Sequence, residues 1–219
     1  MVNLQNSTNF MIRLTSQSDK NSAEAYDAIF FERAKKGVHW ADARRWKTLL
    51  KYYKDETNLI DLGCLDSKIP QYMKRANGYY LGVDMAIKAI EAMYRSYQSQ
   101  VDFRVGDIYN LPKDFENRFD YAVLGEVLEH LEFPDRAVRE AFRVLRVGGI
   151  LAISTPLLEE NEPGALDAER HIWSFDTIDI ARMIEEAGGT VIDYKILRSK
   201  WFPIYKYSWP TIVCWATKK

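Results

Sequence analysis

Cysteine is scarce in this chain of 219 residues, which contains only Cys64 and Cys214. Two cysteines without metal-ligand spacing exclude a disulfide scaffold and a cysteine-rich zinc site. Long apolar runs are also missing, so the sequence predicts no helix that crosses a bilayer. Residues 1–22 lack the apolar segment of a secretory signal. We therefore expect a cytoplasmic protein with no membrane partner.

An excess of charge of either sign is absent as well, because the formal net charge is only -1. Dedicated nucleic-acid binders usually have a basic footprint, so nucleic acid is not an expected partner. One local exception is the stretch 26–54, with eight Lys or Arg residues against three acids. We interpret it as a solvated helix face. A basic lid over an anionic substrate is the alternative interpretation.

Short apolar segments alternate with helical periodicity along most of the chain. Strands are expected at 58–62, 79–83, 101–105, 121–124 and 150–154. Helices between strands of this kind give right-handed crossovers and a mostly parallel sheet. The last two expected strands, 190–197 and 211–217, have no helix between them and should pair antiparallel. The fold class is therefore α/β, a doubly wound, Rossmann-like sheet.

The expected helices have recognisable ends. A helical leader spans 26–54 and breaks at Gly37, and further helices cover 69–76 and 87–97. Asp135 is expected to cap a helix that runs to Leu145, and Ser174 or Asp176 to cap a later helix that ends at Gly188.

These patterns predict a single domain at residues 23–219. It would consist of a helical lid at 23–56 and a catalytic sheet at 57–219, preceded by a flexible tail at 1–22 that is rich in Ser, Asn and Gln.

Three acids follow three successive strands: Asp61, Asp84 and Asp107. In doubly wound sheets ligands bind beyond the carboxyl ends of the strands. Gly63 permits a tight turn and close backbone approach there. Asp84, 21 residues after Gly63, is placed to accept ribose hydroxyls, and Asp107 to receive the amine of adenine. The sequence therefore predicts a site for an adenosine-containing cofactor.

The loop after the first strand selects between cofactor classes. A dinucleotide needs a glycine-rich loop against its diphosphate. Here Leu65 and Asp66 occupy that loop, and the Asp66 carboxylate would repel a diphosphate. A cofactor without phosphate, carrying a cationic sulfonium, tolerates such a loop. We therefore expect S-adenosylmethionine.

Residues 58–197 resemble the class I S-adenosylmethionine-dependent methyltransferases of the broad type 11 kind, the group that includes ubiquinone-biosynthesis methyltransferases. The resemblance rests on NLIDLGC, YYLGVDMAIKAIEAM, VDFRVGDIYNLP, the stretch FDYAVLGEVLEHLEFPDRAVREAFRVLRVGGILAISTP, and HIWSF followed by a helix and EEAGG. It implies a seven-stranded sheet with an antiparallel last strand. It also implies three contact pairs with the cofactor, which are Gly63 and Cys64 at the methionine part, Asp84 and Met85 at ribose and adenine, and Asp107 and Ile108 around the adenine.

The same resemblance places Gly125 beside the sulfonium. The chain departs from the family at Leu65 and Ser67, where glycine is usual. A side chain at Leu65 is expected to tilt the loop or weaken cofactor binding.

The segment after the fourth strand, Gly125–His130, carries the candidate chemistry. Helical spacing would place Glu126, Glu129 and His130 on one face. Three interpretations remain open. His130 packs or caps a turn, His130 is a general base for a hydroxyl or amine acceptor, or Glu126, Glu129, His130 and His171 hold a divalent metal. A metal is compatible with this spacing but is not expected, because His171 has a simpler use as a helix cap.

The main hypothesis is therefore methyl transfer from S-adenosylmethionine to oxygen or nitrogen of a small molecule, with His130 as the candidate catalytic residue. One alternative is a methyltransferase for nucleic-acid ends, suggested by the basic leader and by the aromatic and lysine-rich loop 199–210. The other is a catalytically silent cofactor-binding or scaffold protein, suggested by Leu65 and Ser67.

Overall fold

The computed structural model describes residues 12–13, 21–36, 40–73, 78–97, 101–157, 170–198 and 210–219. Most of the predicted aromatic loop, at 199–209, lies outside these residues, as do Gly37 and the last part of the helix expected at 69–76.

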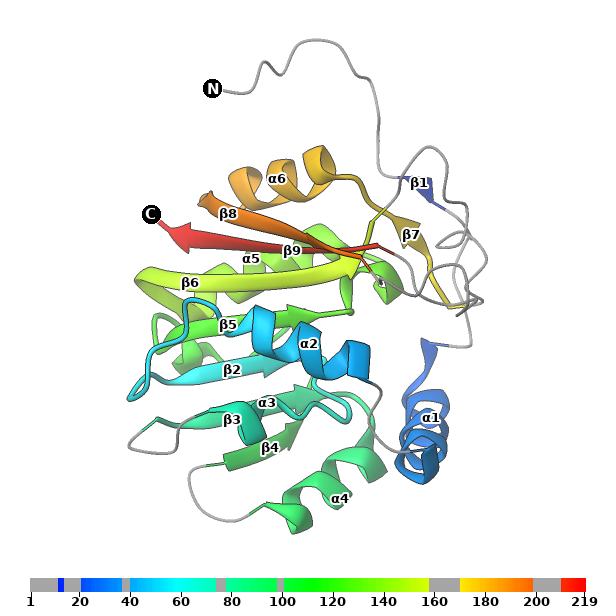
Figure 1. The fold of residues 1–219 in the computed structure, drawn as a ribbon. Helices are drawn as coiled ribbons and strands as arrows, with labels where there is room; N and C mark the ends of the chain where they lie inside the picture. The colour runs from blue at the N-terminus through cyan, green and yellow to red at the C-terminus, as the bar shows by residue number, and fades with distance from the viewer. Residues whose placement is uncertain are drawn as a thin grey trace.

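A seven-stranded sheet forms the centre of the molecule (Figure 1), with the strand order β4-β3-β2-β5-β6-β9-β8. The strands span Leu59–Leu62 (β2), Tyr80–Asp84 (β3), Val101–Val105 (β4), Phe119–Gly125 (β5), Leu145–Pro156 (β6), Gly189–Leu197 (β8) and Thr211–Lys218 (β9). β2 to β6 pair parallel where they are neighbours, whereas β9 is antiparallel to both β6 and β8. The expected doubly wound fold, with the last strand antiparallel, is confirmed.

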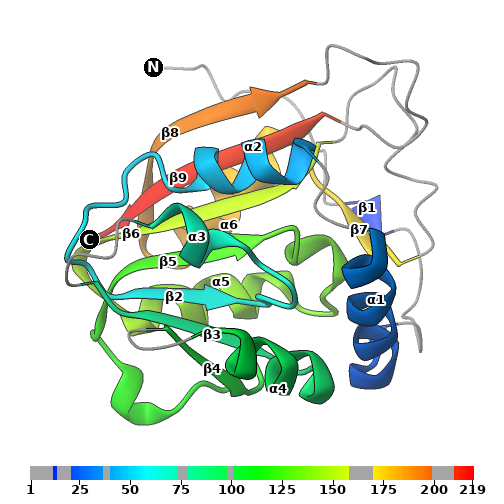
Figure 2. The ribbon, with the colours of Figure 1, turned by 60° about the horizontal axis from the view of Figure 1, so that its bottom comes forward.

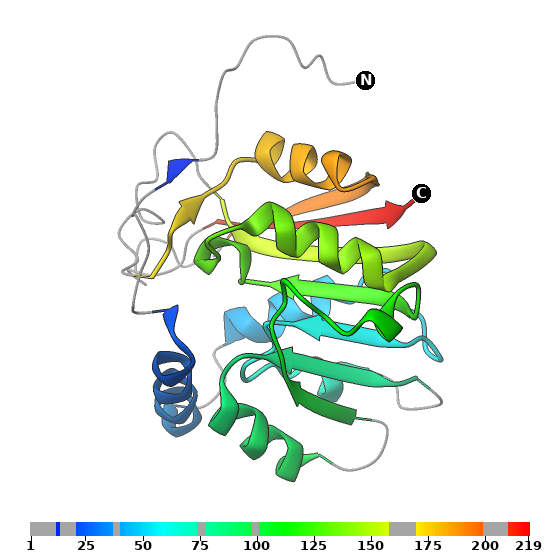
Figure 3. The ribbon, with the colours of Figure 1, turned by 180° about the vertical axis from the view of Figure 1, so that it is seen from behind.

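Helices cover both faces of the sheet. They span Ala23–Lys36 (α1), Trp40–Leu49 (α2), Ile69–Tyr72 (α3), Ile87–Ser96 (α4), Pro134–Val144 (α5) and Thr177–Glu186 (α6). Apolar residues of α2, α3 and α4 pack with one face, and those of α5 and α6 pack with the other. The helices α5 and α6 come to the front when the molecule is seen from behind (Figure 3). All residues of β2 are buried, because helices cover the sheet on both faces. This is expected of a central parallel strand.

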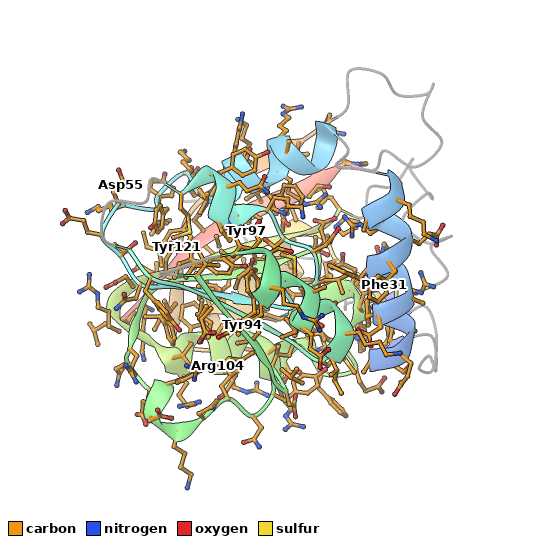
Figure 4. All side chains as sticks on the ribbon, turned by 90° about the horizontal axis from the view of Figure 1, so that it is seen from below. Phe31, Asp55, Tyr94, Tyr97, Arg104 and Tyr121 are labelled. Atoms are coloured by element: carbon orange, nitrogen blue, oxygen red, sulfur yellow. The ribbon has the colours of Figure 1, made fainter. Side chains whose placement is uncertain are left out.

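The leader helices have different positions relative to the sheet. α2 lies on one face of the sheet, where the carbonyl of Leu49 accepts hydrogen bonds from the Tyr121 hydroxyl at 2.6 Å and from the Trp215 indole N–H at 3.2 Å. α1 stands across the carboxyl ends of the parallel strands (Figure 2). Seen from below, Phe31 on α1 and Asp55 before β2 lie at opposite ends of the molecule (Figure 4). α1 therefore stands at the sheet edge where doubly wound folds bind ligands.

A buried acid of α1 forms a hydrogen bond with α4. Oδ1 of Asp27 accepts a hydrogen bond from the backbone N–H of Ala89 at 2.9 Å. Ala89 lies in the first turn of α4, whose own N-cap residue, Ala86, has no capping side chain. Asp27 therefore caps a helix from outside it, which satisfies an N–H group that the helix itself leaves unpaired.

Two stretches of the segment expected to be a flexible tail have defined positions. Ile12–Arg13 (β1) pairs antiparallel with Trp173–Ser174 (β7). The side-chain amide of Asn21 donates to the carbonyls of His130 and Arg170, both at 3.1 Å. The beginning of the chain therefore contacts the segments that carry the candidate chemistry.

Helix starts confirm one capping expectation and correct another. Asp176 caps α6 and forms a reciprocal capping box with Asp179. Asp135 does not cap α5, because the N-cap is Phe133 and Pro134 occupies the first turn. Proline at that position has a backbone angle already suited to a helix, and Asp135 instead forms an ion pair with Arg139.

None of the described helices is long and apolar enough to span a membrane.

Candidate functional site

A cavity of about 780 Å³ opens at the carboxyl ends of β2, β3, β4 and β5. Its volume lies within the range of small-molecule sites, roughly 300–1,000 Å³. All eight residues expected to contact the cofactor line it: Asp61, Gly63, Cys64, Asp84, Met85, Asp107, Ile108 and Gly125. The structure thus brings together side chains that are separated by up to 64 positions in the sequence.

Gly63 makes the turn that ends β2. Its φ of +75° lies in the left-handed region, and a Cβ atom added there would lie 2.6 Å from Cγ2 of Val127. The N–H groups of Gly63 and Cys64 both donate to the carbonyl of Val83, at 2.8 and 3.2 Å. Glycine is therefore required by close packing as well as by backbone conformation.

Asp84 organises the loop from the neighbouring strand. Oδ2 accepts from the N–H of Leu65 at 2.8 Å, and Oδ1 accepts from the N–H of Ala86 at 2.9 Å. The residue is only 6% exposed. Burial raises the pKa of the carboxyl group, and the N–H groups of Ala86 and Leu65 oppose that shift. Each oxygen retains a further lone pair with which it can accept a ligand hydroxyl.

Asp61 lies beneath the loop and is almost completely buried. Oδ2 accepts from the Tyr80 hydroxyl at 2.8 Å. Burial raises the pKa of its carboxyl group from 3.8 to about 6, although hydrogen bonds from Ser67 and Tyr80 favour the charged form. Ser67 therefore supports Asp61 and does not leave the loop open as glycine would.

Leu65, the departure from the family pattern, has a left-handed backbone with φ of +32°. This conformation is strained for a leucine. Its side chain is buried in the cluster that contains Phe30, Trp46 and Ile69. The strain is therefore offset by packing against the leader and α3, and the loop keeps its hydrogen bond to Asp84.

The rim of the cavity contains Met85, Asp107 and Ile108. Met85 is 44% exposed, although it is a large apolar side chain. Oδ1 of Asp107 accepts from the N–H of Tyr109 at 2.9 Å, and the residue is exposed at the cavity mouth. An exposed apolar side chain beside an exposed acid is a suitable surface for a planar ring with a polar edge.

The segment after β5 differs from the helix expected there. Glu126 has a left-handed φ of +58°, and only Leu128–His130 form a 3₁₀ turn. Glu126 is therefore not on one helical face with Glu129 and His130. The cause is a tertiary contact, because the N–H of Glu126 donates to the carbonyl of Ser154 on β6 at 2.8 Å.

His130 lines the cavity, with its side chain 20% exposed. Nδ1 lies 3.0 Å from the carbonyl oxygen of Arg170. A carbonyl can only accept, so this bond assigns the proton to Nδ1 and leaves the lone pair on Nε2, which lies 3.8 Å from Oε1 of Glu129. Burial lowers the pKa of the imidazole, although the bond to Arg170 opposes the shift. A neutral ring with one basic nitrogen is the form that a general base requires.

Three of the four candidate metal ligands come together. Ligand atoms of Glu129, His130 and His171 lie within 4.8 Å of one another, and this group does not include Glu126. The imidazole rings of the two histidines are 4.9 Å apart and meet edge to face. Glu129 is 2% exposed, its Oε2 accepts from the Thr155 hydroxyl at 3.0 Å, and burial raises the pKa of its carboxyl group. Of these three residues, only His130 lines the cavity.

The leader supplies residues that the sequence did not identify as site residues. Its two helices contribute to the cavity wall through Tyr26, Ile29, Arg33, Arg45, Trp46 and Leu49. Arg33 forms an ion pair with Asp66 at 3.1 Å, and Arg45 lies 3.7 Å from Glu126. Exposed basic residues such as Arg44 and Lys47 fit the expected solvated face. The leader is thus solvated on one side and lines the cavity on the other, which its apolar periodicity at Ile29, Trp46 and Leu49 could have indicated.

Comparison with known proteins agrees with this geometry. The chain is 30% identical over 130 residues to an uncharacterised methyltransferase of Schizosaccharomyces pombe, covering 50% of this chain and 46% of that protein. It is 30% identical over 100 residues to a ubiquinone biosynthesis O-methyltransferase of Xanthomonas oryzae pv. oryzae, covering 44% and 42%. The chain thus spans less than half the length of both relatives.

A solved structure shares the fold over nearly its whole length. It is the 1,6-didemethyltoxoflavin-N1-methyltransferase of Burkholderia thailandensis, with bound 1,6-didemethyltoxoflavin and S-adenosylhomocysteine. The TM-score is 0.71 at 16% identity, over 99% of this chain and 98% of that chain. Residues 60–153 match the family model of a methyltransferase domain. Over these residues the chain is therefore similar to S-adenosylmethionine-dependent methyltransferases, and the solved structure shares its fold.

Proposed function

We propose that this protein transfers a methyl group from S-adenosylmethionine to an oxygen or nitrogen atom of a small molecule. The observation that carries the proposal is the convergence of Asp61, Asp84 and Asp107 on one cavity that Gly63 and Gly125 also line. Asp84 would accept the ribose hydroxyls, and Asp107 with Ile108 and Met85 would hold the adenine. Gly63 and Cys64 would face the methionine part, and Gly125 the sulfonium.

Backbone hydrogen bonds in the loop after β2 favour this cofactor over a dinucleotide. A diphosphate is held by free N–H groups at the start of a helix. Here the N–H groups of Gly63 and Cys64 donate to Val83, and that of Leu65 donates to Asp84. These three donors are therefore already paired within the protein. The repulsion expected from Asp66 is a weaker argument, because Arg33 lies 3.1 Å from its carboxylate.

The protein's part in the reaction would be positioning, exclusion of water and removal of a proton. The cofactor supplies an electrophilic methyl group, and the leader helices cover the cavity that would hold the acceptor. Nε2 of His130 carries the lone pair that would accept the proton, because Nδ1–H is bonded to the carbonyl of Arg170. We propose His130 as the base for an acceptor hydroxyl or amine.

A metal is not required by this proposal. The group of Glu129, His130 and His171 has the ligand types of a divalent site. However, Glu129 and His171 do not line the cavity, so an ion there would border the acceptor only through His130. We therefore propose chemistry that depends on His130 and not on a bound ion.

A crystal structure of the protein soaked with S-adenosylhomocysteine tests the assignment. We expect the ribose at Asp84 and the adenine between Met85 and Ile108. Ligand density elsewhere, with the cavity unchanged, would refute the site. Crystals soaked with NADH serve as the control, and we expect no dinucleotide in the cavity.

A further inference from the structure

Glu126 has a backbone conformation that its side chain does not favour. Its φ of +58° lies in the left-handed region, at the turn between Gly125 and Val127. Such a conformation is strained in a residue other than glycine, and residues of this kind cluster at functional sites. Glycine would fit this turn without strain. The glutamate therefore suggests that its carboxylate has a function at this position.

One carboxylate oxygen of Glu126 receives no hydrogen bond from the residues that the structure describes. This oxygen, Oε1, is buried. The nearest cation, Nη1 of Arg45, lies 3.7 Å from Oε2, which is too far for a hydrogen bond. The side chain is 22% exposed and lines the cavity. Buried polar groups are normally paired, so a donor from a bound ligand would complete this site.

The surroundings of Glu126 indicate what kind of ligand would bring that donor. Arg45 balances the negative charge locally, so a cationic group would gain little beside Glu126. An anionic group would be repelled by the carboxylate. Ile29, Trp46 and Leu49 line the same cavity from the leader, and such side chains pack well against a flat apolar molecule. An uncharged ring with a hydroxyl or N–H group matches both features.

We infer that Glu126 selects the methyl acceptor by accepting a hydrogen bond from an uncharged hydroxyl or N–H group on an aromatic molecule. This inference rests on the proposed function, since it names the acceptor class for the same cavity. Arg45 then serves as a counter-charge to the Glu126 carboxylate. Acceptors whose group next to Glu126 is a carboxylate or an ammonium are selected against.

Four probes of similar size test the selection: phenol, anisole, benzoate and protonated benzylamine. Each is titrated calorimetrically into the protein saturated with S-adenosylhomocysteine. Phenol should bind about tenfold tighter than anisole, because a methyl group replaces the hydroxyl hydrogen in anisole and removes the donor to the charged carboxylate. Benzoate and benzylamine should bind more weakly than phenol.

Two variants separate this role from a structural one. Glu126→Ala should remove the preference for phenol over anisole and leave the affinity for S-adenosylhomocysteine unchanged. Glu126→Gly should do the same while raising the melting temperature, because it also relieves the strained φ. The matched control is Glu56→Gly, since Glu56 also has a positive φ, of 80°, but is exposed outside the cavity. It should raise the melting temperature and keep the preference for phenol.

Several outcomes would overturn the inference. These are equal affinity for all four probes, no saturable binding of phenol, tighter binding of benzoate or benzylamine, or an unchanged preference in Glu126→Ala. Binding of Mn²⁺ that Glu126→Gln abolishes would also overturn it, by giving the carboxylate another partner. Failure to bind S-adenosylhomocysteine counts against the proposed function instead. The four titrations are then repeated on the protein alone, where the same preference for phenol is expected.

Discussion

Asp61 is a single residue at which the proposed cofactor site would oppose stability. Its carboxyl group is buried beneath the loop after β2, and its pKa in the folded protein is raised by burial from 3.8 to about 6. The folded protein therefore retains a proton between these values that the unfolded chain releases. Linkage then requires that the stability contributed by this group is greatest at low pH and falls as pH rises through about 6.

Replacing Asp61 with asparagine should raise stability at neutral pH. The gain should be on the order of 2–3 kcal/mol above pH 6, because the variant no longer loses a proton from a buried group, and it should vanish as pH falls toward 4. Thermal unfolding across pH measures it. Asp114→Asn, an exposed control that is 73% accessible, should change little. A gain independent of pH would contradict the assigned titration.

His130 gives a second residue-scale prediction, on the pH dependence of turnover. Because burial lowers its pKa below the ordinary value of 6.5, the ring stays neutral as pH falls through 6.5 and protonates only below it. Methyl transfer should therefore persist at pH 6.5 and decline at lower pH. His130→Ala should lower turnover by roughly 10²–10⁴-fold, the usual contribution of a positioned base.

A chelator provides the control for this prediction, because a metal at Glu129, His130 and His171 would also make His130 essential. Turnover should be unchanged in excess chelator, and His171→Ala should affect stability more than rate. Loss of turnover on chelation, with recovery on adding Mn²⁺ or Mg²⁺, would contradict the role of His130 as a base.

At the scale of elements, α1 is joined to the rest of the fold by a buried hydrogen bond as well as by apolar packing. Asp27 joins it to the first turn of α4, and the same helix provides Tyr26, Ile29 and Arg33 to the cavity. A change in this one attachment should therefore affect both the covering of the cavity and the stability of α4.

Asp27→Ala should cost about 0.5–2 kcal/mol of stability, the range measured for loss of an N-cap. It should also speed amide hydrogen exchange in α1 and in the first turn of α4. Asp27→Asn retains an acceptor oxygen and should behave like the native protein. Glu24→Ala, an exposed position on the same helix, is the matched control. Equal protection of α1 in Asp27→Ala and Glu24→Ala would show that the attachment does not hold the helix.

Helices and strands could be predicted from the sequence where the periodicity of apolar residues determines them. They could not be predicted where a tertiary contact determines the backbone conformation. The strand expected at 101–105 is observed with the same bounds, Val101–Val105. In contrast, the spacing of Glu126, Glu129 and His130 fits a helix, but the N–H of Glu126 is bonded to Ser154 on β6. The start of α5 was misplaced because Pro134 determines it, and not the capping acid at Asp135.

At the scale of the whole molecule, the order of the strands explains why the residues proposed to bind the cofactor could be expected at one cavity, whereas the leader residues that line it could not. β2 lies between β3 and β5, so residues that follow these strands must meet at one edge of the sheet. The apolar periodicity of the leader indicates that one side is buried, but not where the leader lies relative to that edge. Arg45 and Trp46 enter the cavity only because α2 packs on the sheet through Leu49, Tyr121 and Trp215.

The central claim is that the cavity at this edge binds S-adenosylmethionine, and calorimetric titration with S-adenosylhomocysteine tests it most directly. Saturable binding is expected in the native protein, and Asp84→Ala should weaken it by about 1.5–3 kcal/mol, because hydrogen bonds from the ribose hydroxyls to a charged acceptor are lost. Asp114→Ala should bind as the native protein does, and NADH should not bind. An unchanged dissociation constant in Asp84→Ala, or NADH affinity equal to that of S-adenosylhomocysteine, would contradict the account.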